Sequence, residues 1–355
     1  MTKIYLIRHA EAEGNIYRRA HGHHNGLITI RGYKQIERLK KRFEDIHIDA
    51  VYSSDLSRAC TTATALSDPR ELPIIKTEKL REVKLGIWED NAWGDIEYRY
   101  REMSNYFSND PKKWIVEDSE LYENVKARMF DFITETAKHH KDETIAFFSH
   151  GFAIRSLMCL LDGVVSNETA KIPYYDNTAV TGMIYDNGTI TVKHRGCASH
   201  LDNEISTLAH QTWWRPEIRK HSENLRFLPL NKVACEELLR IFKAKAGERA
   251  HVDVQYAAFL EDEPVGILGI DTEKDNKRGV GWISYIHVIP HHRKKTYATQ
   301  LLGLAVSDFR KLKREKIRIE LPAGSMGTNF MTKCGFDVLD VTDKLCLMEK
   351  TIKNW

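Results

Sequence analysis

The sequence predicts an α/β protein with a three-layer α/β/α domain followed by an α+β domain built on a mixed sheet. The chain has 355 residues, whereas single cores rarely grow past about 250–300 residues. In the first half, short apolar strands end directly in polar residues that open helices, and a new strand-and-helix pattern starts at Leu225. We therefore predict a first domain over 1–205, a linker and interface over 206–223, and a second domain over 224–355.

The first strand, predicted over Ile4–Ile7, ends directly in Arg8 and His9. A histidine at the exit of a buried strand is held rigidly, and a guanidinium beside it can hold a phosphate group. A neutral imidazole can attack phosphorus and divide one difficult reaction into two easier steps. Alone, the Arg8–His9 pair is weak evidence, because most histidines at strand ends are structural.

Three later segments supply the other groups that such a site needs. A strand predicted over 50–52 leads into a helix whose first turn carries Arg58, and the free N–H groups of that turn favour an anion. Glu82 lies in a loop, where it can protonate a leaving alkoxide. A strand over 144–148 ends at His150, just before another helix. Because parallel strands end at one edge of a sheet, these side chains are expected to meet there.

Together these segments resemble the histidine phosphatase superfamily, also called the phosphoglycerate mutase-like family, over roughly Met1 to Asp202. The resemblance implies a phosphoglycerate mutase-like fold and phosphomonoester hydrolysis without a metal or cofactor. It assigns the catalytic roles to the nucleophile His9, the phosphate-binding Arg8 and Arg58, the proton donor Glu82 and the second histidine, His150.

The loop after the nucleophile departs from the family pattern at Ala10, where Gly is usual, and at Ala12, where Thr is usual. Asn15 matches the asparagine of that loop, and Asn177 opens a segment that resembles a late strand of the family. The resemblance implies that both asparagines bind the substrate.

Three histidines, His21, His23 and His24, follow in a loop. A metal site is one interpretation of this group. No matched Cys, Asp or Glu accompanies it, so we predict a solvated loop on the substrate side and no metal.

Aromatic residues crowd the segment between Trp88 and Glu120, which is the expected substrate lid. They either contact an apolar or ring-bearing part of a small phosphomonoester substrate or only pack the lid helices. We favour a monoester phosphatase over phosphoglycerate mutase-type phosphoryl transfer, which stays the alternative. Further along, Trp213 and Trp214 are expected to pack between the domains.

The second domain is predicted from alternating strand and helix patterns. Its expected elements are strands over 225–230, 254–260, 264–270, 281–289 and 317–321, a final strand after Phe336, and helices over 231–245 and 299–311.

This order resembles the GNAT family of N-acetyltransferases over roughly Asn224 to Lys350. The resemblance implies acetyl-CoA as cofactor, with its pyrophosphate held by backbone N–H groups at a helix start. The predicted cofactor-binding residues are Val288, Arg293, Lys294, Lys295, Thr296, Tyr297 and Ala298.

Two positions put acetyl transfer in doubt. Thr296 stands where the family has its first Gly, and a β-branched residue crowds an approach that Gly leaves open. Met331 stands where the family often has a Tyr, and Tyr285 and His287 are the only ionisable residues on the strand that often carries the base. A degenerate domain that binds a ligand stays open, as does an acyltransferase with a regulatory phosphatase-like domain.

Whole-chain features indicate a cytoplasmic enzyme. The net charge is +3, too small to imply attraction to nucleic acid or a membrane surface. The six cysteines include no Cys-x-x-Cys pair, which predicts free thiols in a reducing compartment. We identify no signal peptide and no apolar run long enough to span a bilayer. The oligomeric state stays open.

Overall fold

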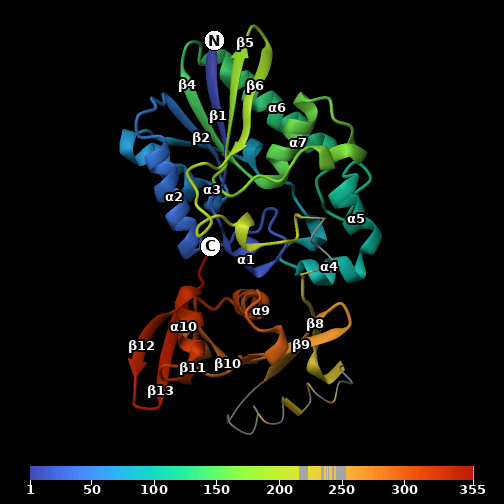
Figure 1. Ribbon diagram of the computed structural model, residues 1–355, viewed down its shortest axis with the longest axis vertical. Coiled ribbons are helices and arrows are strands. Elements are labelled where there is room, and N and C mark those ends of the chain that lie inside the picture. The colour runs from blue at the N-terminus through green and yellow to red at the C-terminus, as the bar shows by residue number, and fades with distance from the viewer. Residues whose placement is uncertain are drawn as a thin grey trace. The chain divides into compact units, whose positions relative to one another are not determined.

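The protein is represented by a computed structural model that describes residues 1–215, 223–232, 236, 238, 240–241, 244 and 253–354. The chain divides into two compact units. The first unit comprises residues 1–12, 20–89 and 100–220, and the second comprises residues 13–19, 90–99 and 221–355. Each unit is built around its own sheet, as Figure 1 shows.

The first unit contains a six-stranded sheet in the order β3-β2-β4-β1-β5-β6. Its strands are β1 (Thr2–Arg8), β2 (Ala50–Ser54), β3 (Ile74–Thr77), β4 (Thr144–Ser149), β5 (Val180–Asp186) and β6 (Thr189–Cys197). The first four are parallel, β5 pairs antiparallel with β1, and β6 pairs antiparallel with β5. Asn187 and Gly188 both have positive φ, as a tight hairpin turn between β5 and β6 requires.

Helices cover both faces of this sheet (Figure 1). One side carries α2 (Ile30–Arg42) and α3 (Ser57–Ser67), and the other carries α6 (Tyr122–His139) and α7 (Gly151–Leu161), with α5 (Arg101–Asn109) nearby. Thr29 caps α2 by accepting a hydrogen bond from the Gly32 amide, and Ile36 and Leu39 bury its apolar face. The predicted three-layer α/β/α fold is confirmed.

The second unit contains a seven-stranded mixed sheet in the order β12-β13-β11-β10-β9-β8-β7. Its strands are β7 (Arg226–Pro229), β8 (Val254–Leu260), β9 (Glu263–Asp271), β10 (Val280–Val288), β11 (Lys316–Pro322), β12 (Asp337–Val341) and β13 (Leu345–Thr351). Among the strands that the structure describes in this unit, only β10 and β11 pair in parallel. The helices α9 (Tyr297–Lys311) and α10 (Met326–Lys333) accompany the sheet. The predicted α+β fold is confirmed.

Two short segments from the first 100 residues belong to the second unit. They contain α1 (Glu13–Tyr17) and α4 (Trp93–Arg99). Tyr17 is buried in the same apolar cluster as Leu301 of α9, and Glu13 forms an ion pair of 2.7 Å with Arg310. The predicted boundaries at 205 and 224 stay a prediction. They did not anticipate these two segments. No local sequence pattern shows whether a helix packs on neighbouring elements or on elements far along the chain.

Short 3₁₀ helices connect several elements. They are η1 (Asp68–Arg70), η2 (Glu78–Leu80), η3 (Gly86–Trp88), η4 (Ser166–Lys171), η5 (Leu208–His210), η6 (Leu230–Lys232), η7 (Asn276–Arg278) and η8 (Pro290–His292).

The end of the second unit differs from the sequence-based prediction, and one predicted helix of this unit cannot be compared in full. Two strands, β12 and β13, follow Phe336, where a single final strand was expected, because the turn between them lacks a strong Gly or Pro signal. The helix predicted over 231–245 lies partly outside the described residues.

The tryptophans of the linker contact residues of the first unit. Tyr174 packs edge-on against Trp213, and the Trp214 indole donates a hydrogen bond to the Leu208 carbonyl. Packing of the two tryptophans between domains stays a prediction.

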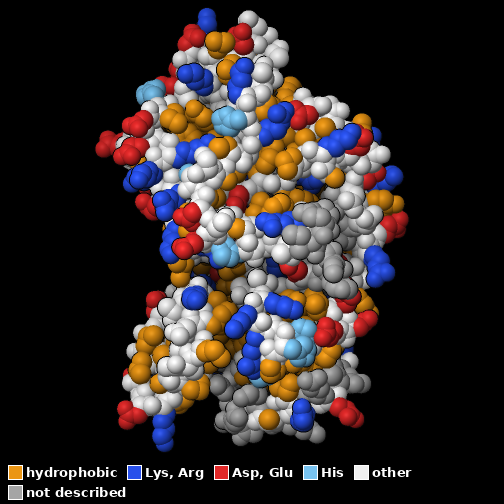
Figure 2. All heavy atoms as spheres, in the orientation of Figure 1, with side chains coloured by type: hydrophobic (Ala, Val, Ile, Leu, Met, Phe, Trp, Pro, Cys, Tyr) orange, Lys and Arg blue, Asp and Glu red, His pale blue; other side chains and the backbone are white. Residues whose placement is uncertain are grey.

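Basic and acidic side chains are intermixed on the face drawn in Figure 2, in keeping with the small net charge. Among the residues that the structure describes, no helix combines the length and the apolar character needed to cross a membrane.

Candidate active site

His9 follows β1 and is 5% exposed. Its Nδ1 lies 2.7 Å from the carbonyl oxygen of Ala10, which can only accept, so Nδ1 carries the proton. Nε2 therefore keeps its lone pair. Burial, together with the charges of Arg58 and Arg8, holds the pKa of His9 well below its usual range. The ring is neutral near pH 7, and a neutral ring is the form that can act as a nucleophile.

His150 caps the N-terminus of α7, and its ring centroid lies 5.1 Å from that of His9. The Nε of Arg58 donates a hydrogen bond of 3.2 Å to Nδ1 of His150, which places the His150 proton on Nε2. That Nε2 is buried and has no hydrogen-bond partner among the described residues. Burial, then the charges of Arg58 and His9, holds the pKa of His150 well below its usual range. A neutral N–H donor is thus available at the site.

Arg8 and Arg58 are both buried guanidinium groups. Nη1 of Arg8 donates to the Tyr175 carbonyl over 2.5 Å, while its Nε has no hydrogen-bond partner among the described residues. Burial lowers the pKa of Arg58 to about 10, so the group stays charged at neutral pH. Within the described part of the chain, no carboxylate forms an ion pair with either arginine. Asp176 and Glu82 stabilise the charge of Arg8, and Glu82 and Glu89 that of Arg58, only at longer range, so an anionic ligand would supply the missing direct partner.

Glu82 lies in the loop after η2 and is anchored at the N-terminus of α7. Its Oε1 accepts a hydrogen bond of 2.8 Å from the Ala153 amide, and its Oε2 accepts one of 3.0 Å from the Phe152 amide. These amides belong to the free donors of the first helical turn. Glu82 and His150 are therefore held by the same helix end.

The histidine loop contains His21, His23 and His24, and its solvation on the substrate side stays a prediction. His21, His23 and His24 are half-buried, because the backbone carbonyls of this loop serve the site. Nη1 of Arg58 donates to the His24 carbonyl over 3.0 Å, and its Nη2 donates to the Gly22 carbonyl over 2.7 Å. The loop thus holds Arg58 by its backbone.

Glu89 fixes the histidine loop and was not singled out from the sequence. Its carboxylate accepts hydrogen bonds from the backbone amides of His23, His24 and Leu85 at 2.8–2.9 Å. Gly22 lies so close that a Cβ there would be 2.3 Å from Glu89 Oε1. Glu89 directly follows η3, and no local sequence pattern there signals this role.

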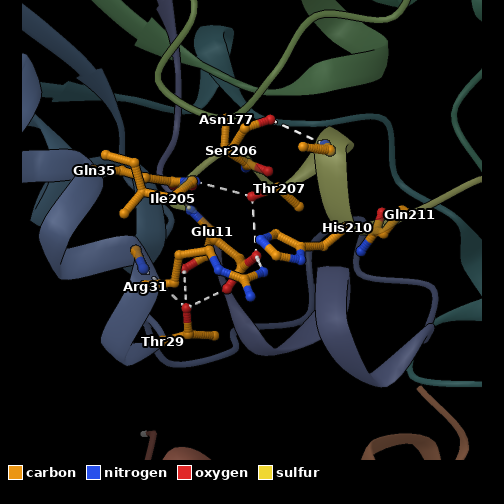
Figure 3. Close-up of polar contacts among 12 residues, drawn as sticks. Glu11, Thr29, Arg31, Gln35, Asn177, Ile205, Ser206, Thr207, His210 and Gln211 are labelled. Carbon is orange, nitrogen blue, oxygen red and sulfur yellow. Dashed lines mark hydrogen bonds and ion pairs between the residues drawn. The ribbon is translucent and has the colours of Figure 1, made fainter. Parts of the chain in front are cut away.

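Glu11 ties the loop after His9 to the segment around 205–211 (Figure 3). Its carboxylate accepts hydrogen bonds from Thr29 over 2.6 Å and from Thr207 over 3.0 Å, and it pairs with Arg31 over 3.1 Å. Gln35 accepts a bond from the Glu11 amide over 2.8 Å and donates to the Ile205 carbonyl over 2.7 Å. This network holds the backbone that follows His9.

The two asparagines predicted to bind substrate lie in different units. Asn177 is fully buried, and its Nδ2 donates to the His9 carbonyl over 2.9 Å, which fixes the backbone of His9. Asn15 lies on α1, within the second compact unit. Binding of substrate by either asparagine stays a prediction.

The aromatic residues of the lid that belong to the first unit pack against one another. Trp88 and Trp114 are fully buried with ring centroids 5.6 Å apart. Phe107 stacks on Phe152 of α7 at 4.9 Å. The hollow beside these phenylalanines measures ≈ 10 Å³, about the room that one water needs. The described contacts favour the packing interpretation of these residues.

In the second unit, β10 and β11 separate part-way along their length. Their parallel pairing runs from Val280 to Ile283, whereas β10 continues to pair with β9 as far as Val288. A register shift lies between Ile283 and Tyr285. The predicted cofactor-binding loop follows the end of β10.

That loop leads directly into α9. Arg293 is drawn back to the strand, because its Nε donates to the Val288 carbonyl over 3.0 Å. Lys294 adopts a positive φ of 63°, and Lys295 lies over the Tyr297 ring at 5.6 Å. Thr296 is the N-cap residue, and its φ of −79° is ordinary for a β-branched residue. Ala298 lies in the first turn of α9, where N–H groups have no partner within the helix.

Met331 is buried in the core of the second unit at 2% exposure. A packing role therefore accounts for this residue, which replaces the expected Tyr. Tyr285 is also buried, and burial raises its pKa well above the usual range.

Residues 4–198 match the family model of the histidine phosphatase superfamily, branch 1. The chain belongs to the histidine phosphatase superfamily. In this histidine phosphatase family member, residues 217–336 additionally match the model of the acetyltransferase (GNAT) family. Both predicted resemblances are confirmed.

Relatives of this family member include phosphatases. It is 30% identical over 164 residues to phosphoserine phosphatase 1 of Hydrogenobacter thermophilus, covering 46% of this chain and 78% of that protein. It is 28% identical over 162 residues to the adenosylcobalamin/alpha-ribazole phosphatase of Escherichia coli, covering 46% and 80%. Among solved structures, Bacillus stearothermophilus YhfR superposes with a TM-score of 0.55 at 30% identity, covering 57% of this chain and 100% of that one.

Proposed function

We propose that the first unit hydrolyses phosphomonoesters through a phosphohistidine on His9. The observation that carries this proposal is the tautomer of His9, whose hydrogen bond to the Ala10 carbonyl leaves Nε2 free. Two further features support it. Arg8 and Arg58 are buried without a carboxylate partner among the described residues. His150 presents an Nε2 donor that lacks a partner within the same described set.

In the first step, Arg8, Arg58 and His150 Nε2–H donate to the non-bridging phosphate oxygens, where charge must be stabilised. Nε2 of His9 attacks phosphorus, and the P–O ester bond breaks. Glu82, in its protonated form, gives its proton to the leaving oxygen, which departs as an alcohol. The ring becomes a cation, and the Ala10 carbonyl stabilises it through the Nδ1–H bond.

In the second step, water attacks the phosphohistidine. The Glu82 carboxylate accepts a proton from that water, and the N–P bond breaks. Inorganic phosphate leaves, while His9 returns to the neutral form and Glu82 to the protonated form. No residue outside the site is required to balance protons.

The substrate is proposed to be a small phosphomonoester. Two relatives are named for phosphoserine and alpha-ribazole phosphatase activity, so these esters are the first candidates. Hydrolysis is proposed because the relatives matched at 30% and 28% identity over 164 and 162 residues are named phosphatases. Other relatives are named probable phosphoglycerate mutases, so transfer to a second substrate hydroxyl stays the alternative.

The test measures phosphate release from a panel that contains phosphoserine, alpha-ribazole phosphate, 3-phosphoglycerate and an aryl phosphate. His9→Ala should abolish release, and His47→Ala, a variant of an exposed histidine in the same unit, should not. Rapid quenching at high pH should trap acid-labile phosphate on wild type and on His47→Ala, but not on His9→Ala. Turnover that persists in folded His9→Ala would contradict the assigned nucleophile.

We further propose that the second unit binds acyl-CoA. The separation of β10 and β11 after Ile283, next to the loop that opens α9, favours this second function. The free N–H groups of the first turn of α9 would receive the pyrophosphate, as helix N-termini do. Lys294 and Lys295 add positive charge beside that turn.

Calorimetric titration with acetyl-CoA tests this second proposal. The charge-reversed double variant Lys294→Glu/Lys295→Glu should weaken binding by at least ~10-fold, whereas Lys277→Glu/Lys333→Glu, with the same change in net charge elsewhere in the unit, should bind like wild type. Equal weakening in the two double variants would show that only overall charge matters, which contradicts a site at the loop.

A further inference from the structure

In the second unit, the consecutive residues His291 and His292 lie close to Glu263. His291 and His292 lie in η8, and Glu263 begins β9. A backbone hydrogen bond of 2.8 Å from the Ile289 amide to the Val265 carbonyl holds the two segments together. On the face drawn in Figure 2, histidine side chains gather beside acidic ones on this unit.

The donor atoms of these three residues converge on a small volume. Nε2 of His292 lies 3.1 Å from Oε1 of Glu263, and Nε2 of His291 lies 3.6 Å from the same oxygen. One ligating atom from each residue lies within 4.8 Å of the other two. The two imidazole rings have centroids only 4.1 Å apart.

The ring nitrogens of His292 lack well-directed hydrogen bonds to the described residues around them. Its side chain is 5% exposed, yet neither ring nitrogen has a well-directed hydrogen bond to any described residue. Buried polar atoms nearly always have a partner, so each exception needs an explanation. The contact with Glu263 is short enough for a hydrogen bond but is not aligned as one.

The spacing suits a metal better than a hydrogen bond. Zinc binds histidine nitrogen and carboxylate oxygen at roughly 2.0–2.2 Å in a tetrahedral arrangement, which places neighbouring ligand atoms about 3.3 Å apart. The observed separations of 3.1 and 3.6 Å lie on either side of that value. We propose that Glu263, His291 and His292 form a binding site for a divalent transition-metal ion such as Zn²⁺.

Two imidazoles and one carboxylate are a donor set that zinc and cobalt accept. Side chains of His291 and Glu263 are 63% and 57% exposed, so the fourth position is open to water. The ion would clamp the start of β9 to η8, one residue before Arg293 opens the loop that leads into α9. This site is separate from the phosphatase chemistry and does not depend on acyl-CoA binding.

The experiment uses the full chain, stripped with a chelator and titrated with Zn²⁺ and with Co²⁺. Calorimetry measures zinc affinity, and visible absorption reports whether bound Co²⁺ is four-coordinate. Wild type should bind one Co²⁺ with an intense tetrahedral spectrum. His291→Ala and Glu263→Gln should each weaken zinc binding by at least ~10-fold and remove that spectrum. Both side chains are more than half exposed, so these variants should fold.

His139→Ala is the control, because it removes an exposed histidine on α6 that is close to a carboxylate, Glu135, at 3.9 Å. It should bind Co²⁺ like wild type. An unchanged tetrahedral spectrum in both His291→Ala and Glu263→Gln would overturn the site. Its loss in His24→Ala instead would overturn it as well, since the ion would then lie at the histidine loop.

Discussion

Arg58 donates its Nε–H to Nδ1 of His150 over 3.2 Å, and this bond decides which nitrogen of His150 faces the site as a donor. The same guanidinium is held by the carbonyls of His24 and Gly22. Arg58 therefore orients a second donor, and in the proposed mechanism it also supplies positive charge for the phosphate. Both depend on the planar fork of five N–H groups that only arginine has.

Substituting Arg58→Lys should lower kcat for phosphate release by roughly 10²- to 10³-fold, the usual cost of losing one oxyanion donor. Lysine retains the charge but cannot bond His150 and two carbonyls in one plane. Steady-state kinetics on the best monoester measures the effect. Arg38→Lys, at an exposed arginine that pairs with Asp202 over 3.4 Å, is the matched control and should keep wild-type kcat. A loss below 3-fold in Arg58→Lys would refute the orienting role.

Protein stability should fall as pH drops below about 6.5, the usual pKa of histidine. Burial holds the pKa of His9 and of His150 well below that value and lowers the pKa of His200 to about 4. Below pH 6.5 the unfolded chain thus binds more protons than the folded one, so the free energy of unfolding rises with pH in this window. Each unit of pKa shift contributes about 1.4 kcal/mol.

Urea unfolding between pH 5 and pH 8 measures this dependence. His200→Asn should flatten the curve, because it removes one of the shifted groups. His139→Ala, which removes an exposed histidine, should leave the slope as it is in wild type. Stability that rises on acidification from pH 7 to pH 5 would contradict the assigned directions.

Gly22→Ala should damage the site without touching a catalytic side chain. A Cβ there would lie 2.4 Å from the Val83 carbonyl and 2.3 Å from Glu89 Oε1. The loop must shift, and the Gly22 carbonyl that holds Arg58 must shift with it. We expect kcat to fall by about 10-fold and stability by about 1–3 kcal/mol, as for an overpacked site. Gly327→Ala is the control, because its Cβ would meet neighbours at an ordinary 3.4 Å.

Replacing only one partner of the buried ion pair between Glu13 and Arg310 should lower the free energy of unfolding strongly. Its side chains are 2% and 7% exposed. Arg310→Met leaves a buried carboxylate without its main partner and should reduce the free energy of unfolding by about 3–5 kcal/mol. The double variant Glu13→Gln/Arg310→Met should lose less. Denaturant titration of the full chain compares them, and additive losses would contradict direct coupling.

Truncation after Asn224 should not yield an intact phosphatase. Tyr17 is buried in a cluster with residues of α9, and a Cβ on Gly303 would lie 2.4 Å from the Cβ of Tyr17. Removing the rest of the second unit exposes α1 and α4. We expect a truncated chain with a lower melting temperature and lower turnover than the full chain. Equal melting temperature and equal kcat would contradict this expectation.

The main parts of the fold and five candidate catalytic residues could be predicted from the sequence, because each has a local signature. Arg8 and His9 follow an apolar strand, Arg58 lies in the first turn of a helix, and His150 follows a strand that precedes another helix. Strand and helix periodicity needs only neighbouring residues to be seen. The hairpin at Asn187–Gly188 was predictable for the same reason.

Other features arise from partners far apart in the sequence. The Arg58–His150 bond joins residues 92 positions apart, and the ion pair of Glu13 with Arg310 joins residues 297 positions apart. The carbonyls of the histidine loop and the amides that the Glu89 carboxylate binds are backbone groups, which every residue possesses, so no residue type marks these contacts. The membership of α1 and α4 in the second unit also depends on contacts with distant strands and helices.

By itself, the sequence determined which residues stand at strand ends and helix starts, and therefore the α/β class, the family and the candidate catalytic residues. The tertiary structure alone decided the tautomers of His9 and His150, the burial of two arginines without a carboxylate partner among the described residues, and the meeting of Glu263 with His291 and His292. The physical reason is the separation along the chain between the residues that interact. Secondary structure follows from spacing along the chain, whereas hydrogen-bond direction, burial and charge pairing depend on atoms that only folding brings together.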